Sequence, residues 1–276
     1  MSTTEMPAGW ERLSFGAPLA DGLSIQERLR QQGFGLLSAE QVYSMIGESA
    51  AASCAAAIPL WSHLPADRYL KDGGRYRSRR HGSFVQQLDV QGSESELIHV
   101  PQRAHWQPIT YNALHGGMLR WFEPLADELV GLAFWQPLVC QLGHLFAEVR
   151  PVEQWFIEAH QFRIDARDGV GRPTPEGAHR DGVDFVAVIL MGRNNIRGGE
   201  TRVFELDGLR GVRFTLTQPC SVLLMDDQRI NHESTPIMPL DTQGDSWRDT
   251  LVLTFRAEGF LEPVHPATSA NSENKD

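Results

Sequence analysis

A series of short strand-like segments in the C-terminal half of the chain constrains the fold more than any other feature. Buried strands are indicated by DFVAVILM (184–191) and SVLLMDD (221–227), because both are apolar and rich in large aliphatic residues. The other segments are WFIEAHQFRI (155–164), ETRVFEL (200–206), VRFTLT (212–217) and DTLVLTFR (249–256). Turn signals separate the segments at a spacing of roughly 8–14 residues, which predicts a β-sandwich or a jelly-roll barrel.

The preceding part of the chain is mainly helical in pattern. Ser38 is a suitable N-cap for one alanine-rich helix over 39–57, and segment 109–149 predicts one or two helices. An arginine-dense segment within 66–90 is compatible with a strand. The predicted class is mostly β with helices (α+β).

The predicted architecture is a double-stranded β-helix (jelly-roll, cupin-like) core over about 151–258, flanked by a helical part over about 24–150. We expect one domain over 1–263. The small polar residues of 264–276 predict a disordered tail.

Composition excludes several classes of partner. The formal net charge of −10 gives no attraction to nucleic acid or to an anionic membrane, and no run of about 18 apolar residues predicts a membrane span. The N-terminus lacks the basic and apolar regions of a secretion signal. Cys54, Cys140 and Cys220 lie far apart and read as buried hydrophobic residues in a reducing compartment. We therefore expect a cytoplasmic protein.

His179 and Asp181 form the most suggestive polar pattern. On extended backbone, residues i and i+2 project to the same face, so both side chains can reach one metal ion. A third ligand is available from His232, which follows a buried strand and its turn, 53 positions on. Two histidines and one carboxylate are the facial triad of non-haem Fe(II) oxygenases.

The His179–Asp181 spacing, a histidine followed two residues later by an acid, has little specificity by itself. With ten histidines and 35 acidic residues in 276 positions, a histidine followed two residues later by an acid occurs about once by chance. Two polar loop residues that hydrogen-bond a turn would give the same pattern. The surrounding sequence therefore has to distinguish a metal site from a structural loop.

Three features around the triplet favour a metal centre. Arg248 opens the last predicted strand, where its guanidinium can pair with a carboxylate of a dicarboxylic acid, although a surface salt bridge is the common role there. The interval between the two histidines holds several strands, enough to cross a barrel mouth. Gly198 and Gly199 permit a tight hairpin or bulge beside it.

These segments resemble a known family. The runs EGAHRDGVDFVAVILMGRNNIRGGETRVF, LLMDDQRINHESTPI and WRDTLVLTF are similar to the Fe(II)- and 2-oxoglutarate-dependent dioxygenases grouped with bacterial L-isoleucine dioxygenase. The resemblance extends upstream to LPADRYLKDGGRYRSRRHGSF, YNALHGG, RWFEPL and HQFRI, and covers roughly residues 30–258.

The resemblance implies a jelly-roll fold in which His179, Asp181 and His232 are the catalytic metal ligands for Fe(II) and Arg248 anchors 2-oxoglutarate. Its cofactors would be Fe(II), 2-oxoglutarate as co-substrate, and O₂. It further implies hydroxylation of an unactivated C–H bond in a free L-amino acid, with release of succinate and CO₂. Aliphatic acceptors such as isoleucine or leucine and cyclic ones such as pipecolate both occur among such enzymes.

An amino acid substrate requires groups that bind its carboxylate and ammonium. The candidates are Arg77, Arg79, Tyr111, Asn112, His115 and His160. Strand alternation would direct Arg77 and Arg79 to one face and Arg80 to the other, although a solvated basic face would look the same. His115 also fits a helix cap or a core position.

Three other functions remain open. A protein or peptide hydroxylase of the same fold would need a long exposed groove. A cupin-like metalloenzyme would not use 2-oxoglutarate, and a non-catalytic binding module would hold no iron. The expected partner is a small-molecule amino acid rather than nucleic acid or membrane, and a homodimer is left open.

Overall fold

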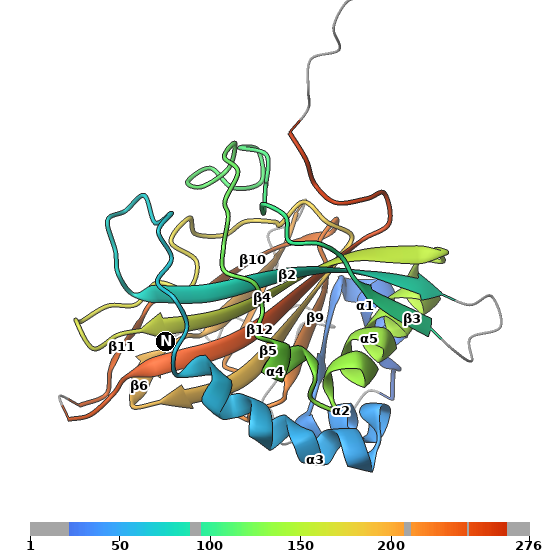
Figure 1. The fold of residues 1–276 in the computed structure, drawn as a ribbon, viewed down its shortest axis with the longest axis horizontal. Coiled ribbons are helices and arrows are strands. Elements are labelled where there is room, and N and C mark those ends of the chain that lie inside the picture. The colour runs from blue at the N-terminus through green and yellow to red at the C-terminus, as the bar shows by residue number, and fades with distance from the viewer. Residues whose placement is uncertain (1–21, 89–94, 207–210, 242, 264–276) are drawn as a thin grey trace, which may run out of the picture.

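The computed structural model describes residues 22–88, 95–206, 211–241 and 243–263 (Figure 1). Its helices are α1 (Ile25–Gln32), α2 (Ala39–Ile46), α3 (Glu48–Ala57), a 3-10 helix (Ile58–Trp61), α4 (Asp127–Val130) and α5 (Trp135–Val149). Its strands are β1 (Phe34–Leu37), β2 (Arg77–Leu88), β3 (Ser95–His99), β4 (Gln154–Asp165), β5 (Phe185–Asn194), β6 (Ile196–Gly198), β7 (Thr201–Glu205), β8 (Gly211–Phe214), β9 (Val222–Asp226), β10 (Ile230–Ser234), β11 (Ile237–Pro239) and β12 (Trp247–Arg256). The expected disordered tail, 264–276, lies outside the described residues.

The strands form one large sheet and a second, smaller layer. The large sheet has seven strands in the order β1-β9-β5-β12-β4-β2-β3, and the smaller layer consists of β10-β7-β8 and β11-β6. The strand pairs are antiparallel. This confirms the predicted class, a mostly β jelly roll with helices.

Alternation along β5 shows how the two faces of the large sheet are used. Phe185, Ala187 and Ile189 belong to the core shared with the helices, whereas Val186 and Leu190 belong to the core shared with the smaller sheet. Both faces are apolar at this strand, which explains why its sequence reads as an unbroken apolar run. The helices thus pack on one face of the large sheet, and the smaller sheet and the cavity lie on the opposite face.

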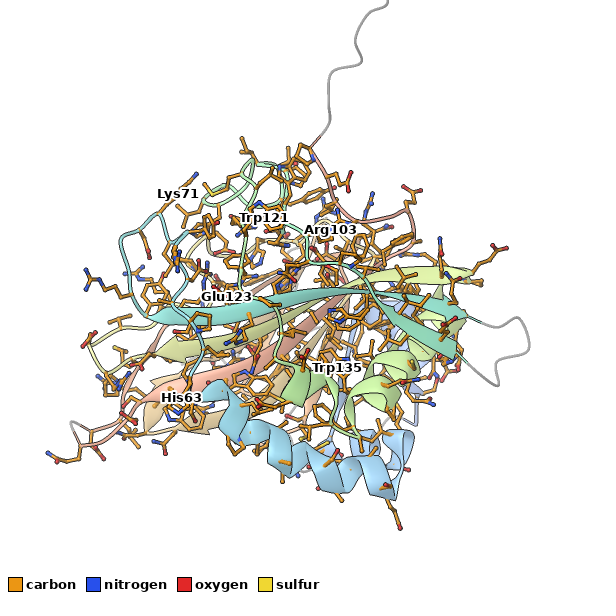
Figure 2. The ribbon with its side chains drawn as sticks, in the orientation of Figure 1. His63, Lys71, Arg103, Trp121, Glu123 and Trp135 are labelled. Atoms are coloured by element: carbon orange, nitrogen blue, oxygen red, sulfur yellow. The ribbon has the colours of Figure 1, made fainter. Side chains whose placement is uncertain are left out.

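The helices cover one face of the large sheet (Figure 1). The ring of Phe146 in α5 stacks on Phe185 with a centroid distance of 4.5 Å, and both side chains are fully buried. The Trp61 indole donates to the backbone oxygen of Thr250 at 3.2 Å. Trp135 lies on this helical side, while Lys71, Trp121 and Arg103 lie in segments on the opposite side (Figure 2).

The helices differ from the sequence predictions in two places. The predicted single helix over 39–57 is two helices, because Gly47 takes φ +85° and ψ 155° between α2 and α3. Segment 109–149 is helical only from Asp127 onward. A Cβ on Gly116 would meet the backbone oxygen of Asn112 at 2.4 Å, so the chain folds into a tight turn there instead of a helix.

The part expected to be helical, about 24–150, also contributes β1, β2 and β3 to the large sheet. All three cysteines are buried, as predicted. No helix within the described residues is long and apolar enough to cross a membrane.

Candidate active site

The register of β2 against β4 builds one wall of a cavity between the two layers. Arg77 lies opposite Ile164, Arg79 opposite Phe162, and His81 opposite His160. Alternation places these side chains on the face of the sheet away from the helices. Residues that line the cavity come from several elements and include Arg77, Arg79, His105, Gln107, Asn112, Arg120, Glu158, His160, Phe162, Ile164, Glu176, His179, Asp181, Val188, His232, Arg248, Thr250, Val252 and Leu261.

His179, Asp181 and His232 come together at one end of this cavity. The backbones of the two histidines are joined by a pair of hydrogen bonds, with N to O distances of 3.1 and 2.9 Å. His179 Nε2 lies 3.9 Å from Asp181 Oδ1, and His232 Nε2 lies 3.8 Å from Asp181 Oδ2. His232 belongs to β10, a strand that sequence patterning missed because its segment INHES is polar. The three residues thus form a candidate iron-binding triad.

Hydrogen bonds orient this triad for a cation. His179 Nδ1 donates to the Gly177 oxygen at 2.9 Å, which leaves the Nε2 lone pair toward Asp181. Gln107 Nε2 donates to Asp181 Oδ1 at 3.2 Å. Asp227 accepts from the backbone N–H of Asp181 at 2.9 Å and so fixes the turn that carries this carboxylate. Two imidazole nitrogens and one carboxylate fit a divalent iron ion.

The pKa values in the triad reflect burial and mutual charge. Burial lowers the pKa of His232 well below its ordinary value. Burial acts on His179 in the same direction, but the charges of Asp181 and Glu176 outweigh it, and the pKa of His179 is raised. Burial raises the pKa of Asp181. A bound cation requires neutral imidazoles and an ionised carboxylate, so metal binding acts against the raised pKa values of His179 and Asp181.

Arg248 lies in β12, opposite Ile164 of β4, and is 3% exposed. Its Nε and Nη2 atoms are buried without a hydrogen-bond partner, and it forms no ion pair with another described residue. Burial lowers its pKa to about 10, so it is charged at neutral pH. The surface salt bridge that its sequence position allowed is therefore absent, and the cavity contains a buried cation that lacks an anion.

A second cluster of titratable groups lies on the β2–β4 wall. Glu158 accepts from His81 Nε2 at 3.0 Å and from His105 Nδ1 at 3.1 Å. His160 Nδ1 accepts from Arg79 Nη2 at 2.6 Å. This carboxylate and the three imidazoles lie close enough to hold a metal. Their facing atoms are already engaged, however, and the guanidinium of Arg79 would repel a cation.

Burial favours the neutral form of His105 and His160. It lowers the pKa of His105 to about 4 and that of His160 well below its ordinary value. Burial raises the pKa of Glu158, but hydrogen bonds and charges from His105 and His81 outweigh it, and the net pKa is lowered. The sequence patterns did not single out Glu158, His81 or His105. Alternation from His160 identifies Glu158, and His105 has no sequence signal.

The remaining expected substrate contacts separate into two groups. Arg77, Arg79, Asn112 and His160 line the cavity, whereas Tyr111 and His115 do not. A Cβ on Gly182 would lie 2.4 Å from the Tyr111 ring, so this side chain packs on the turn after Asp181. His115 Nε2 accepts from the backbone N–H of Lys71 at 3.3 Å, which is a structural role.

Comparison with known proteins identifies the family. A family model described as 2OG-Fe dioxygenase matches residues 58–254, so the chain belongs to the 2OG-Fe dioxygenase family. It is therefore an Fe/2-oxoglutarate oxygenase, an enzyme class that uses Fe(II), 2-oxoglutarate and O₂. The search of curated proteins found no match.

Solved structures show the same fold. A bsmA homolog from Methylobium petroleophilum PM1 is 54% identical, with 87% of this chain and 94% of that chain covered and a TM-score of 0.80. IDO from Bacillus thuringiensis is 20% identical, with 86% and 97% covered and a TM-score of 0.68. The Fe(II)/(alpha)ketoglutarate-dependent dioxygenase TqaL is 20% identical, with 84% and 85% covered and a TM-score of 0.60. The last two likenesses concern the fold alone.

Proposed function

We propose that this oxygenase hydroxylates an unactivated C–H bond of a free L-amino acid, with release of succinate and CO₂. The observation that carries the proposal is that the cavity contains more guanidinium groups than 2-oxoglutarate requires. Besides Arg248, the guanidinium groups of Arg77, Arg79 and Arg120 line the same cavity. One arginine suffices for the distal carboxylate of 2-oxoglutarate, so a second anionic group is expected among the remaining guanidinium groups.

His179, Asp181 and His232 hold Fe(II) in this proposal, and Arg248 pairs with the carboxylate of 2-oxoglutarate that lies away from the metal. A guanidinium is suited to this role because it binds a carboxylate through two parallel hydrogen bonds. Fe(II) and 2-oxoglutarate, once bound, supply the oxidising chemistry that activates O₂ and cleaves the C–H bond. The protein binds, orients and excludes water.

The apolar lining supports an aliphatic or cyclic side chain. Phe162, Val188, Val252 and Leu261 also line the cavity. They offer no hydrogen bond to a polar side chain, and they exclude water from the reacting carbon. A peptide would need an open groove, whereas the charged groups here are buried within the cavity.

We also propose that residues 1–263 form a single domain. The helices and the large sheet share one hydrophobic core, in which Phe146 of α5 packs with Phe185 of β5 and Phe255 of β12. Neither part would bury its apolar face without the other.

Anaerobic titration with Fe(II) and 2-oxoglutarate tests the metal and co-substrate assignments. We expect the weak visible charge-transfer band of the chelate in the wild-type protein and its loss in His179→Ala. An equal response of the two proteins would refute the triad.

A panel of free L-amino acids, including isoleucine, leucine and pipecolate, then tests the substrate class. The expected result is succinate release together with a product heavier by one oxygen atom, identified by mass. Succinate without hydroxylated product would mean uncoupled turnover and would not support the proposal. A peptide that is hydroxylated while no free amino acid reacts would favour the protein hydroxylase.

A further inference from the structure

Besides Arg248, three guanidinium groups line the cavity, and two of them have a carboxylate within ion-pair distance. Arg77 Nε donates to Asp67 Oδ2 at 2.8 Å, and Arg79 Nη1 lies 3.9 Å from the same oxygen. Arg120 is the third of these guanidinium groups. It is 2% exposed and forms no ion pair with another described residue. Its Nε atom is buried without a hydrogen-bond partner.

Glu176 is a carboxylate in the same cavity that has a buried acceptor atom without a partner. Its side chain is 9% exposed, and its Oε2 atom is buried without a hydrogen-bond partner. Its Oε1 atom lies 3.7 Å from His179 Nε2. That contact uses Oε1 alone, so Oε2 is left to accept a hydrogen bond from a group that enters the cavity. Arg120 offers the complementary free donor at Nε.

Two amide side chains hold Arg120 and Glu176 in a fixed relation. Gln107 Oε1 accepts from Arg120 Nη2 at 2.8 Å and from Asn112 Nδ2 at 3.2 Å. Asn112 Nδ2 also faces Glu176 Oε1 at 3.4 Å. Arginine can only donate, so the Gln107 oxygen must face Arg120, and its Nε2 atom must then face Asp181. The chain Arg120–Gln107–Asn112–Glu176 is thereby tied to a residue of the metal triad.

We propose that Arg120 binds the α-carboxylate and Glu176 the α-ammonium group of the substrate, so that the enzyme accepts only α-amino acids with both groups free. The proposal rests on the proposed function and assigns the polar half of the substrate to specific residues. A zwitterion supplies one anion and one cation on adjacent atoms, which matches the free donor at Arg120 Nε and the free acceptor at Glu176 Oε2. Blocking either group would leave a buried charge without a partner.

Substrate analogues test this assignment in the wild-type enzyme. The probes are the best free L-amino acid of the panel, its N-acetyl derivative, its methyl ester, and the 2-hydroxy acid that lacks the ammonium group. We expect kcat/KM to fall by at least about 100-fold for each analogue, since the buried polar groups are left unpaired. Comparable turnover of the N-acetyl derivative or the ester would overturn the proposal without any variant.

Variants identify which residue binds the α-carboxylate and which binds the α-ammonium group. In Glu176→Gln, KM for the amino acid should rise at least about 10-fold, and the preference over the 2-hydroxy acid should collapse while the preference over the ester persists. In Arg120→Met the preference over the ester should collapse, while the preference over the 2-hydroxy acid persists. Arg120→Lys should restore part of the affinity, because the charge is kept and the fork geometry is lost.

The surface pair Glu200 and Arg202, at 3.2 Å, provides matched controls because neither residue lines the cavity. Glu200→Gln and Arg202→Met change the charge equally and should retain wild-type KM and analogue preferences. The chelate band with Fe(II) and 2-oxoglutarate should persist in the two site variants, which shows that fold and metal centre are intact.

The outcomes separate the two levels of the proposal. If the variants lower kcat but leave KM and the analogue preferences unchanged, Arg120 and Glu176 are structural, and the amino acid hydroxylase assignment stands. If the wild-type enzyme forms the chelate but oxidises no free amino acid, both the proposed function and this inference are overturned.

Discussion

At the scale of single residues, buried charges without partners define the chemistry of this cavity. Arg248 is the clearest case, because two of its donor atoms have no hydrogen-bond acceptor. Leaving such donors unsatisfied costs free energy in the ligand-free protein, and an anionic ligand recovers it. These buried charges therefore determine which ligands the cavity can bind, although they do not determine which carbon reacts.

Replacement of Arg248 by lysine tests its role in binding 2-oxoglutarate. An ammonium group makes no bidentate pair with a carboxylate, so KM for 2-oxoglutarate should rise about 10- to 100-fold. Steady-state kinetics with varied 2-oxoglutarate at saturating amino acid measures the effect. Arg202→Lys, at the surface, serves as the control and should behave as the wild type does. An unchanged KM in Arg248→Lys would remove Arg248 from the co-substrate site.

At the scale of elements, the short β6–β11 pair and the turn after it position Arg248. Ile237 of β11 pairs with Gly198 of β6. Gly199 follows with φ +68°, and a Cβ there would lie 3.1 Å from Ile237 Cγ2 and 3.3 Å from Arg248 Cδ. Only glycine allows the turn to approach the arginine so closely without strain.

A Gly199→Ala substitution should therefore affect both stability and co-substrate binding. The left-handed backbone costs an alanine about 1–2 kcal/mol, and the added methyl group presses on Arg248. We expect a lower free energy of unfolding together with a higher KM for 2-oxoglutarate, measured by urea denaturation and by kinetics.

Gly244 provides the matched control for this substitution. It has φ +81°, and a Cβ added there would meet no atom within 4 Å, so alanine adds backbone strain alone. Gly244→Ala should lose stability and retain the wild-type KM. Equal KM values in the two variants would mean that the Gly199 turn does not position Arg248.

Local sequence patterns predicted the strands with an apolar or alternating sequence, including the short β7 and β8, but not β6, β10 and β11. β5, β9 and β12 have apolar runs or alternation long enough to recognise. By contrast, β10 is polar because it carries His232 in the cavity, and β6 and β11 are three residues each. Function and length thus remove the periodic signal that identifies a strand.

The candidate site was predictable to a similar extent and for a similar reason. His179, Asp181 and Arg248 lie in segments whose residue types resemble a family pattern. Arg120 and Glu176 instead lie outside the helices and strands, and tertiary contacts through side-chain amides bring them together. The sequence predicts one or two helices over 109–149 from the helical spacing of its apolar residues, whereas the structure has no helix over 109–126, where Asn112 and Arg120 line the cavity.

At the scale of the whole molecule, the fold encloses an unusually charged interior between two sheets. Neutral histidines in that interior link stability to pH. Burial holds the pKa of His105 at about 4, against opposing contributions from Glu158, and the charges of Arg120 and Arg79 lower it further. The unfolded chain binds a proton near pH 6.5, which the folded protein resists until about pH 4.

The contribution of His105 to the free energy of unfolding should consequently be largest above pH 6.5 and fall as the pH is lowered from 6.5 toward 4. In that window the unfolded state binds more protons at this residue than the folded state does, which contributes a loss of about 2 kcal/mol by pH 5. His160, whose pKa is also lowered by burial, adds to the loss. Burial raises the pKa of Asp227 to about 7 and that of Asp249 to about 6, and these carboxyl groups act in the opposite direction, so the contribution of His105 is obtained from a variant.

In His105→Gln the free energy of unfolding at pH 7 minus that at pH 5, measured by urea denaturation, should be about 2 kcal/mol smaller than in the wild type. His63 is exposed (Figure 2), so His63→Gln should keep the wild-type difference. A pH dependence that is the same in His105→Gln and the wild type would mean that His105 does not contribute to it through a depressed pKa.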